Sequence, residues 1–346
     1  MGLNYIAVQW NRQKKLYDSV LVGGVALYLA LFCIVTKSLF PLVTDEIMLI
    51  RAFGTAAVLL LHIILCIGPL CRLSPRILPL LYNRRHAGVT LFIITLVHSG
   101  LVLLTYHSGS DTNPFVSIFV SSPLNGSTSG VPFQPFGFFA LVILFIMAAT
   151  SHDFWLANLS APTWKRLHLM VYAAYALVIM HVTFGVLQGE SSPAYIVTMA
   201  IGLMTVLSLH LLAAKKERIL DQEFVCKLEN DGFVDACAVA DIPENRARIV
   251  CLSGERVAVF KYEGKISAVS NVCQHQNGPL GEGKIVHGCI TCPWHGYQYH
   301  PSTGASPPPF VEKVPTFNVR IVNGRVHVHP HPNPAGTHVE PALVET

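Results

Sequence analysis

The sequence predicts a membrane-embedded bundle of six α-helices followed by a small all-β domain. Of the 346 residues, 52% are hydrophobic and 13% are charged, whereas soluble domains average about 25% charged residues. From about residue 224 onward the pattern changes to short alternating runs such as RVAVFKY and FNVRIVNGRVHV, separated by Gly and Asn turns. Alternation of this kind is typical of β-strands. The chain therefore divides into a membrane part and a soluble part.

Six apolar segments are long enough to be membrane spans. A helix needs about 20 mainly apolar residues to cross a hydrocarbon core of about 30 Å. The six segments lie near residues 18–40, 47–70, 87–107, 135–151, 167–188 and 194–213. The fourth is the shortest and starts after the Pro-containing stretch VPFQPFG. We expect all six to lie in a lipid bilayer.

The Lys and Arg residues between these segments set their expected direction, because positive charges accumulate on the cytoplasmic side of a membrane. They lie before the first segment, between the second and third, before the fifth and after the sixth: Arg12, Lys14, Lys15, Arg72, Arg76, Arg84, Arg85, Lys165, Arg166, Lys215, Lys216 and Arg218. The stretches 107–134 and 188–193 contain neither Lys nor Arg. Both termini are therefore expected in the cytoplasm. The net charge of +4 is small and concentrated in these loops, so we expect no nucleic-acid partner.

The expected domain boundaries follow from the same patterns. Residues 1–17 form a cytoplasmic N-terminus, residues 18–213 the membrane domain, residues 214–229 a linker and residues 230–330 the β domain. Residues 331–346 are expected to be a flexible, solvated tail, because this stretch is interrupted by Pro.

Two Cys-His pairs in the β domain are the strongest candidate metal ligands. Cys273 precedes His275 in CQHQNGPLGEG, and Cys292 precedes His295 in CPWHGYQYHPSTG. Two thiolates and two imidazoles bind either zinc or iron. Zinc fingers usually supply a Cys pair and then a His pair, whereas here each half supplies one of each, as needed when one iron takes two Cys and the other two His.

The two motifs resemble the cluster-binding loops of a Rieske [2Fe–2S] domain over roughly residues 230–330. The resemblance implies that Cys273 and Cys292 hold one iron and that His275 and His295 hold the other. The Ser and the additional Cys residues of quinol-oxidising members are absent at the matching positions, so fewer hydrogen bonds reach sulfur. We therefore expect a potential toward the low end of the range of about −150 to +300 mV, with Tyr299 as one remaining donor.

Histidines in two of the predicted spans are the second set of candidates, because ionisable side chains inside a membrane are costly and mark function. His98 and His181 lie well within the third and fifth segments, and His86 and His168 lie near the cytoplasmic ends of the same segments. At a rise of 1.5 Å per residue, about 18 Å separates His86 from His98 and about 20 Å separates His168 from His181. The four histidines therefore form two cross-helix pairs at two depths, which suits two haem irons.

The match is imperfect at His86. Twelve positions place it about 120° around the helix from His98, whereas fourteen would align the two. His62, on the cytoplasmic half of the second segment, is the alternative partner of His168.

The stretches NRRHAGVTLFIITLVHSG, ATSHDFW and WKRLHLMVYAAYALVIMH resemble the ferric reductase-like transmembrane domain over about residues 45–213. This resemblance implies two b-type haems, with His98, His168 and His181 as ligands and His86 as the fourth. It also implies a bacterial inner (plasma) membrane. Members that reduce iron or oxygen carry or borrow a flavin and nicotinamide module, but the sequence contains no GxGxxG fingerprint for one.

Together the two resemblances imply an electron-transfer oxidoreductase. Electrons are expected to pass from a cytoplasmic donor through the cluster and the haems to a quinone or a periplasmic acceptor, and the ligands alone leave the reverse direction open. The alternative is a membrane-anchored Rieske ferredoxin that serves a cytoplasmic oxygenase and has no haem. The ratio of iron to haem separates the two hypotheses.

Overall fold

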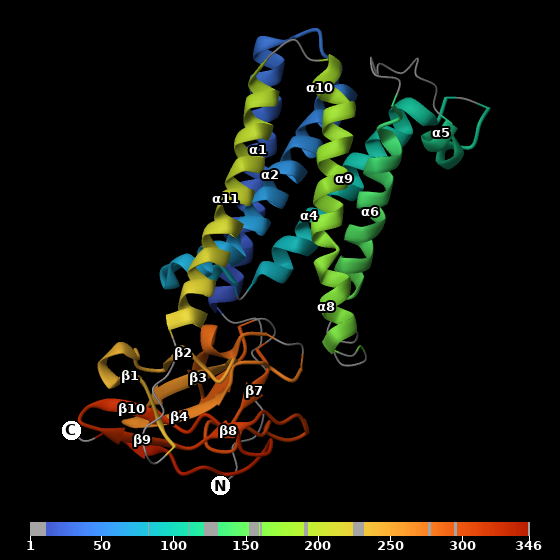
Figure 1. Cartoon of the computed structure of the whole chain (residues 1–346). Helices are drawn as coiled ribbons and strands as arrows, with labels where there is room; N and C mark the ends of the chain where they lie inside the picture. Colours follow the sequence, from blue (N-terminus) through green and yellow to red (C-terminus); the bar gives the residue numbers. More distant parts are fainter. Residues whose placement is uncertain are drawn as a thin grey trace.

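The computed structural model describes residues 12–81, 83–109, 111–120, 131–151, 159, 161–189, 193–223, 232–275, 278–293 and 296–344. Long helices form one end of the molecule and a β domain forms the other (Figure 1). This order confirms the predicted fold class, a helical membrane bundle followed by an all-β domain.

Five helical segments are long and apolar enough to cross a membrane. They comprise α1 (Arg12–Leu39), α2 (Asp45–Leu73), α4 (Arg84–Val102) with a π-helical end at Leu103–His107, α8 (Ala161–Leu169) followed by α9 (Val171–Phe184), and α11 (Pro193–Glu223). The fourth predicted span forms α6 (Gln134–Ala149). Its 16 residues extend about 24 Å, so the count of six spans is not confirmed by helix length. Short helices complete this region: η1 (Pro75–Ile77), α3 (Leu78–Leu81), α5 (Pro114–Val120) and α10 (Val186–Gly189).

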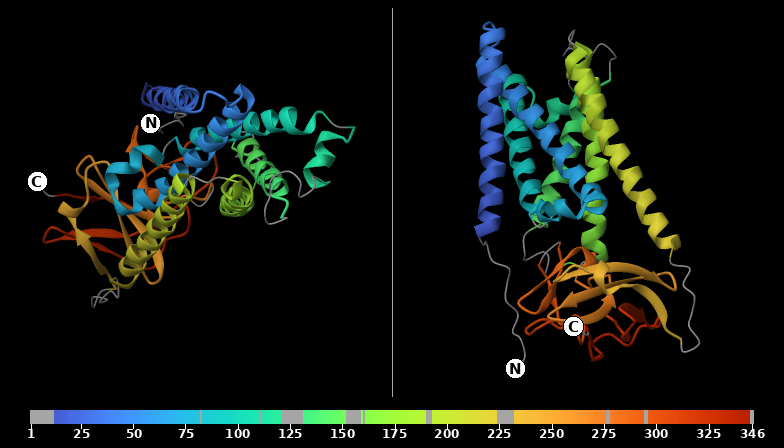
Figure 2. Two further views of the ribbon diagram at one scale, coloured as in Figure 1. Left: turned by 90° about the horizontal axis from the view of Figure 1, so that it is seen from above. Right: turned by 90° about the vertical axis from the view of Figure 1, so that its left-hand side faces the viewer.

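Helix α2 lies at the centre of the bundle. It packs against α4, α11 and α1, while α6 packs against α9. Figure 2 shows α1 at the side of the bundle, and none of its apolar window is buried. The buried residues of the bundle core are Ala56, Leu60, Leu61, Leu65, Leu91, Ile94, Leu144, Ala174, Tyr175 and Val206. Among the described helices, α4 and α9 are not a closely packed pair. Helix α4, which carries His86 and His98, and α9, which carries His181, therefore each pack mainly on other helices.

The β domain consists of three antiparallel sheets. The first has the order β1-β10-β9, the second β11-β4-β3-β2 with β8 also paired to β4, and the third β5-β6-β7. The strands are β1 (Val234–Ala238), β2 (Arg246–Leu252), β3 (Glu255–Tyr262), β4 (Lys265–Ser270), β5 (Lys284–Val286), β6 (Cys289–Thr291), β7 (Gln298–Tyr299), β8 (Thr316–Phe317), β9 (Val319–Val322), β10 (Arg325–Val328) and β11 (Ala342–Leu343). Two short 3-10 helices, η3 (Val239–Asp241) and η4 (Leu280–Glu282), connect strands. The third sheet and η4 carry the loops with the Cys-His pairs.

Two segments differ from the sequence-based expectation. Helix α11 continues to Glu223, so residues 214–223 are helical rather than part of a linker. The expected flexible tail instead packs on the β domain, because Ala342 and Leu343 pair with β4. Upstream of this strand, the backbone N–H of Val339 donates to the Ser302 carbonyl at 2.8 Å. The backbone partners of β11 are on the side of β4 that faces away from β3. This pairing cannot be read from the composition of residues 331–346.

Candidate functional site

Two loops of the β domain bring the candidate cluster ligands together. Cys273 follows β4 and Cys292 follows β6, and both side chains are fully buried. The backbone N–H of Cys273 donates to the Gly278 carbonyl at 2.9 Å, and that of Cys292 donates to the Tyr297 carbonyl at 2.8 Å. The second loop turns at Gly296, whose φ of +73° is a conformation that glycine adopts without strain.

The hydroxyl of Tyr299 lies between the two loops. It is 3.3 Å from Cys273 Sγ and accepts the backbone N–H of His275 at 3.3 Å. Burial, and then the neighbouring thiols of Cys273 and Cys292, raise the pKa of Tyr299 above its usual range. The phenol therefore keeps its proton and can donate it in a hydrogen bond to the Cys273 sulfur. Cys273, His275 and Cys292 thus converge on one side chain.

The imidazole of His275 is held by aromatic packing. Its ring stacks on Tyr297 with a centroid distance of 4.4 Å and an interplanar angle of 9°. Tyr297 in turn donates its hydroxyl to Glu312 and meets Phe310 edge-on at 5.0 Å. This packing fixes the plane of the imidazole, as a metal ligand requires.

The fourth predicted ligand, His295, lies outside the described residues. Within the part of the chain that the structure describes, no three His, Cys, Asp or Glu side chains form a group with metal-site spacing. The donor set nevertheless suits an iron–sulfur cluster, because it combines two buried thiols on facing loops, an oriented imidazole and a phenol proton directed at sulfur.

Three of the candidate haem ligands share one hydrogen-bonding pattern. Nδ1 of His98 lies 2.9 Å from the Ile50 carbonyl, Nδ1 of His181 lies 3.0 Å from the Phe133 carbonyl, and Nδ1 of His168 lies 3.1 Å from the Trp164 carbonyl. A carbonyl oxygen only accepts, so each Nδ1 carries the hydrogen and each Nε2 presents its lone pair. This is the tautomer of a histidine that binds metal through Nε2.

Glycines on neighbouring helices make room for two of these rings. A Cβ atom at Gly54 of α2 would lie 2.9 Å from Cε1 of His98, and one at Gly137 of α6 would lie 2.7 Å from Nδ1 of His181. His98 and His181 are also close enough to interact electrostatically. Each of these two rings therefore occupies space that a glycine on a neighbouring helix leaves open.

His168 has a different environment. Its ring stacks on Trp164 with a centroid distance of 3.7 Å, and its Nε2 lies 3.4 Å from the Ser151 hydroxyl. Trp164 precedes His168 by four residues, the spacing at which side chains meet on one helix face, so the sequence contained a signal for this contact.

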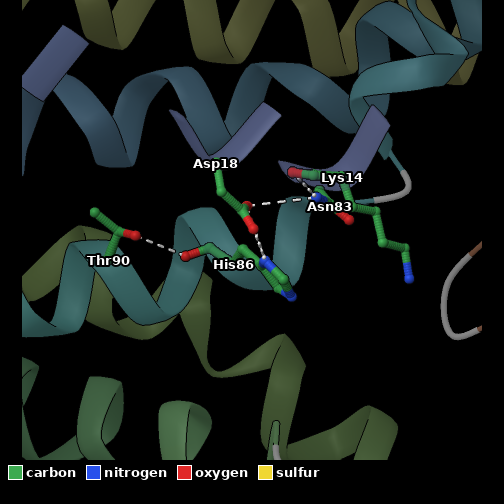
Figure 3. Close-up of polar contacts among 5 residues, drawn as sticks. All are labelled: Lys14, Asp18, Asn83, His86 and Thr90. Atoms are coloured by element: carbon green, nitrogen blue, oxygen red, sulfur yellow. Dashed lines mark hydrogen bonds and ion pairs between the residues drawn. The ribbon is translucent and has the colours of Figure 1, made fainter. Parts of the chain in front are cut away.

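His86 points toward α1. Its Nδ1 lies 2.8 and 2.9 Å from the two carboxylate oxygens of Asp18 (Figure 3). The Asn83 amide donates to the same carboxylate at 3.4 Å, and the Thr90 hydroxyl donates to the His86 carbonyl at 2.9 Å. Because a carboxylate accepts the Nδ1 hydrogen, Nε2 is again the nitrogen left for a metal. Among the described residues no contact joins His86 to His168.

His62 has both ring nitrogens engaged. Nδ1 lies 2.7 Å from the Val58 carbonyl, and Nε2 lies 3.0 Å from the Tyr175 hydroxyl. With the hydrogen on Nδ1, Nε2 accepts the tyrosine proton. Sequence reasoning did not identify Tyr175, because its pairing with His62 depends on how α9 packs against α2.

Comparisons with known proteins agree with both parts of this arrangement. The family model described as Rieske [2Fe-2S] domain matches residues 232–318, and the model described as ferric reductase like transmembrane component matches residues 53–179. The chain belongs to the Rieske [2Fe–2S] proteins and carries a ferric reductase-like transmembrane domain in the same polypeptide. Both resemblances inferred from the sequence are confirmed.

The similar proteins reported below each match less than a third of this chain. The ferredoxin component of the naphthalene 1,2-dioxygenase/salicylate 5-hydroxylase systems of Ralstonia sp is 33% identical over 96 residues, which are 28% of this chain and 92% of the ferredoxin. Apoptosis-inducing factor 3 of Homo sapiens is 32% identical over 27% of this chain and 15% of its own length. A solved complex of oxygenase and ferredoxin in carbazole 1,9a-dioxygenase is 26% identical over 30% of this chain and 98% of that chain, with a TM-score of 0.28.

Proposed function

We propose that this protein transfers electrons across a membrane between a cytoplasmic donor and a quinone or periplasmic acceptor. Its two domains support membrane electron transfer in general. The observation that carries the specific proposal is the tautomer of His98, His168 and His181, each with its hydrogen on Nδ1, so that Nε2 is the nitrogen that can bind a metal. His62 and His210 share this tautomer, but a tyrosine hydroxyl bonds Nε2 of each. In this proposal both termini are cytoplasmic and the membrane is the inner (plasma) membrane.

The chain's own residues have distinct roles in this function. A bound [2Fe–2S] cluster and b-type haems supply the one-electron redox chemistry. Cys273 and Cys292, both fully buried, would hold one iron of the cluster, and the phenol of Tyr299 donates to sulfur. His275 and His295 complete the ligand set.

We assign the haem ligands in two pairs. His98 and His181 hold the outer haem, because helix rise puts them at a similar depth and each has its hydrogen on Nδ1. His168 and His86 hold the inner haem. His86 is preferred to His62 because Asp18 leaves Nε2 of His86 available, whereas Tyr175 occupies Nε2 of His62.

Visible spectroscopy of the full chain purified in detergent tests the proposal. Reduction with dithionite is expected to produce b-type haem bands, and iron and haem analyses are expected to give four irons for two haems and one cluster. His98→Ala and His181→Ala should each lose one haem, while His210→Ala, another histidine in a span, should keep both. Absence of haem bands from the unaltered protein, or their survival in the His98→Ala/His181→Ala double variant, would contradict the proposal.

The alternative function is a membrane-anchored Rieske ferredoxin for a cytoplasmic oxygenase. It is favoured by the ferredoxin component of an oxygenase system among the similar proteins, which this chain covers over 92% of its length. Two cluster irons without haem would support this alternative.

A further inference from the structure

Charged side chains lie where the cluster domain meets the membrane bundle. Arg256 of β3 forms an ion pair with Glu217 of α11. Arg72, near the end of α2, has its Nε 4.0 Å from Oε1 of Glu282, whose side chain is only 18% exposed. Lys216 of α11 donates to the Arg72 carbonyl at 2.8 Å, which ties the end of α2 to α11. The two domains therefore meet through ionic contacts at a fixed set of residues.

Glu282 is part of the first cluster loop. It ends the short helix η4, which is bonded back to the start of the loop. The backbone N–H of Leu280 donates to the Asn271 carbonyl at 2.9 Å, and that of Gly281 donates to the Asn271 side-chain oxygen at 2.7 Å. Asn271 precedes Cys273 by two residues. A displacement of Glu282 therefore also shifts Asn271, because two hydrogen bonds join η4 to that residue. Asn271 lies in the loop that carries Cys273.

Arg84 adds positive charge to the surroundings of the same carboxylate. It begins α4, and its guanidinium lies against α2, because a Cβ at Gly68 would be 3.3 Å from its Nη1. It interacts electrostatically with Glu282 and with His168. The charge of one arginine therefore acts on both the first cluster loop and a candidate haem ligand.

The charged groups around Glu282 lie on α2, α4, α11 and β3. Burial raises the pKa of Glu282; Arg72, Arg84 and Arg256 oppose this shift and Glu217 adds to it. Burying a carboxylate costs free energy even when arginines face it, so such groups are weak evidence of stability and can instead select one arrangement. Domains joined by a small polar interface move relative to each other by default. The Glu282 carboxylate lies at this interface, where its contact with Arg72 can restrain the movement of the cluster domain relative to the bundle.

We propose that Glu282 is a positioning residue that docks the first cluster loop onto Arg72 and Arg84, so that electrons cross between the cluster site and His168 at this joint. The proposal rests on the proposed function. Its docking part concerns only the chain's own residues.

Charge reversal in the full chain tests the docking part. Glu282→Lys places a third cation beside Arg72 and Arg84, so amide hydrogen exchange should become about tenfold faster or more in residues 280–283 and 70–74, since exchange reports local opening. Glu263→Lys makes the same charge change in the exposed β3–β4 turn and should leave these amides unchanged. Glu282→Asp keeps the charge and should stay within about threefold of the unaltered protein.

Stopped-flow reduction tests the electron step. With the cluster reduced first, the rate of haem reduction should fall about tenfold in Glu282→Lys, while the cluster content, the haem content and the rate in Glu263→Lys stay unchanged. Unchanged exchange in Glu282→Lys would overturn the docking role, and faster exchange with an unchanged electron-transfer rate would overturn the placement of the joint. Absence of haem from the unaltered protein would overturn the proposed function and the electron step, but hydrogen exchange would still decide the docking.

Discussion

The hydroxyl of Tyr299 controls the immediate environment of the cluster site. It lies 3.3 Å from Cys273 Sγ, and Tyr299 is itself fully buried. A hydrogen bond to a cluster sulfur stabilises the reduced, more negative state and raises the potential. The potential should therefore be sensitive to this single phenol.

Tyr299→Phe is expected to lower the cluster midpoint potential. A net hydrogen-bond contribution of about 1 kcal/mol corresponds to roughly 40 mV for a one-electron couple. Redox titration monitored by electron paramagnetic resonance measures this shift. Tyr262→Phe is the matched control, because its hydroxyl bonds Ser267 at 3.0 Å rather than a cluster ligand. An equal shift in both variants would show that the hydrogen bond is not the cause.

Two other cysteines of the cluster domain should be chemically inert. Burial raises the pKa of the Cys237 and Cys289 thiols to about 11, so only about one in a thousand is ionised at pH 8, and the thiolate is the reactive form. Alkylation of the native protein at pH 8, followed by mass spectrometry, should spare both and modify the partly exposed Cys251. Rapid labelling of Cys289 before unfolding would contradict its burial.

The site residues were predictable to different degrees. The spacing of Cys273 and His275 predicts that they share one loop, whereas the approach of Cys292 on a second loop depends on how the strands pair. Their role as cluster ligands stays a prediction. The depth of His98 and His181 followed from helix rise, but their hydrogen bonds to Ile50 and Phe133 depend on which helices pack together. Glu282 gave no signal, because its role depends on contact with another domain.

At the scale of the helices, small residues decide whether a histidine ring fits between neighbours. Gly54 and Gly137 lie against His98 and His181. A methyl group at either position would push the imidazole away from the carbonyl that orients it. The orientation of His98 therefore depends on the neighbouring helix α2, and the orientation of His181 depends on the neighbouring helix α6.

Gly137→Ala is expected to lose most of the outer haem. The added methyl carbon would lie 2.7 Å from Nδ1 of His181, and overpacking of this kind costs about 1–3 kcal/mol. The haem-to-protein ratio of the purified variant measures the loss. Gly100→Ala is the control, because its Cβ would meet nothing within 4 Å. Full haem content in Gly137→Ala would argue against His181 as a ligand.

Element boundaries were predictable where hydrophobic length alone sets them. The long spans and the start of the β domain agree with the sequence, whereas the fourth span forms a helix of 16 residues that ends near Thr150. The Thr150 hydroxyl donates to the Ile146 carbonyl at 2.7 Å, which satisfies a backbone group at this end of the helix. Such local bonding is invisible to a hydropathy pattern.

At the scale of the whole molecule, residues 331–344 complete the second sheet. Asn333 donates its backbone N–H to the Thr316 carbonyl at 2.8 Å, and Ala342 pairs with Ile266. Composition suggested a solvated segment, because backbone pairing with a distant strand leaves no trace in residue type.

Removal of residues 332–346 is expected to destabilise the cluster domain. A loss of about 1 kcal/mol lowers the unfolding midpoint of a small domain by about 4–8 °C, and several hydrogen bonds disappear at once. Thermal unfolding followed by circular dichroism measures the change. Leu343→Ser is the control, because this side chain is 69% exposed and its backbone pairing is kept. An unchanged midpoint in the truncated protein would show that the segment adds no stability.

The pairing of β11 and β8 along the same side of β4 also affects how copies of the protein coexist in one membrane. An open strand edge invites the equivalent strand of a neighbour and leads to edge-to-edge association. Copies of the protein in one membrane would hold their equivalent strand edges at the same distance from the lipid surface, so these edges could meet. Because β11 and β8 cover this side of β4, this strand is closed to the equivalent strand of a neighbouring copy.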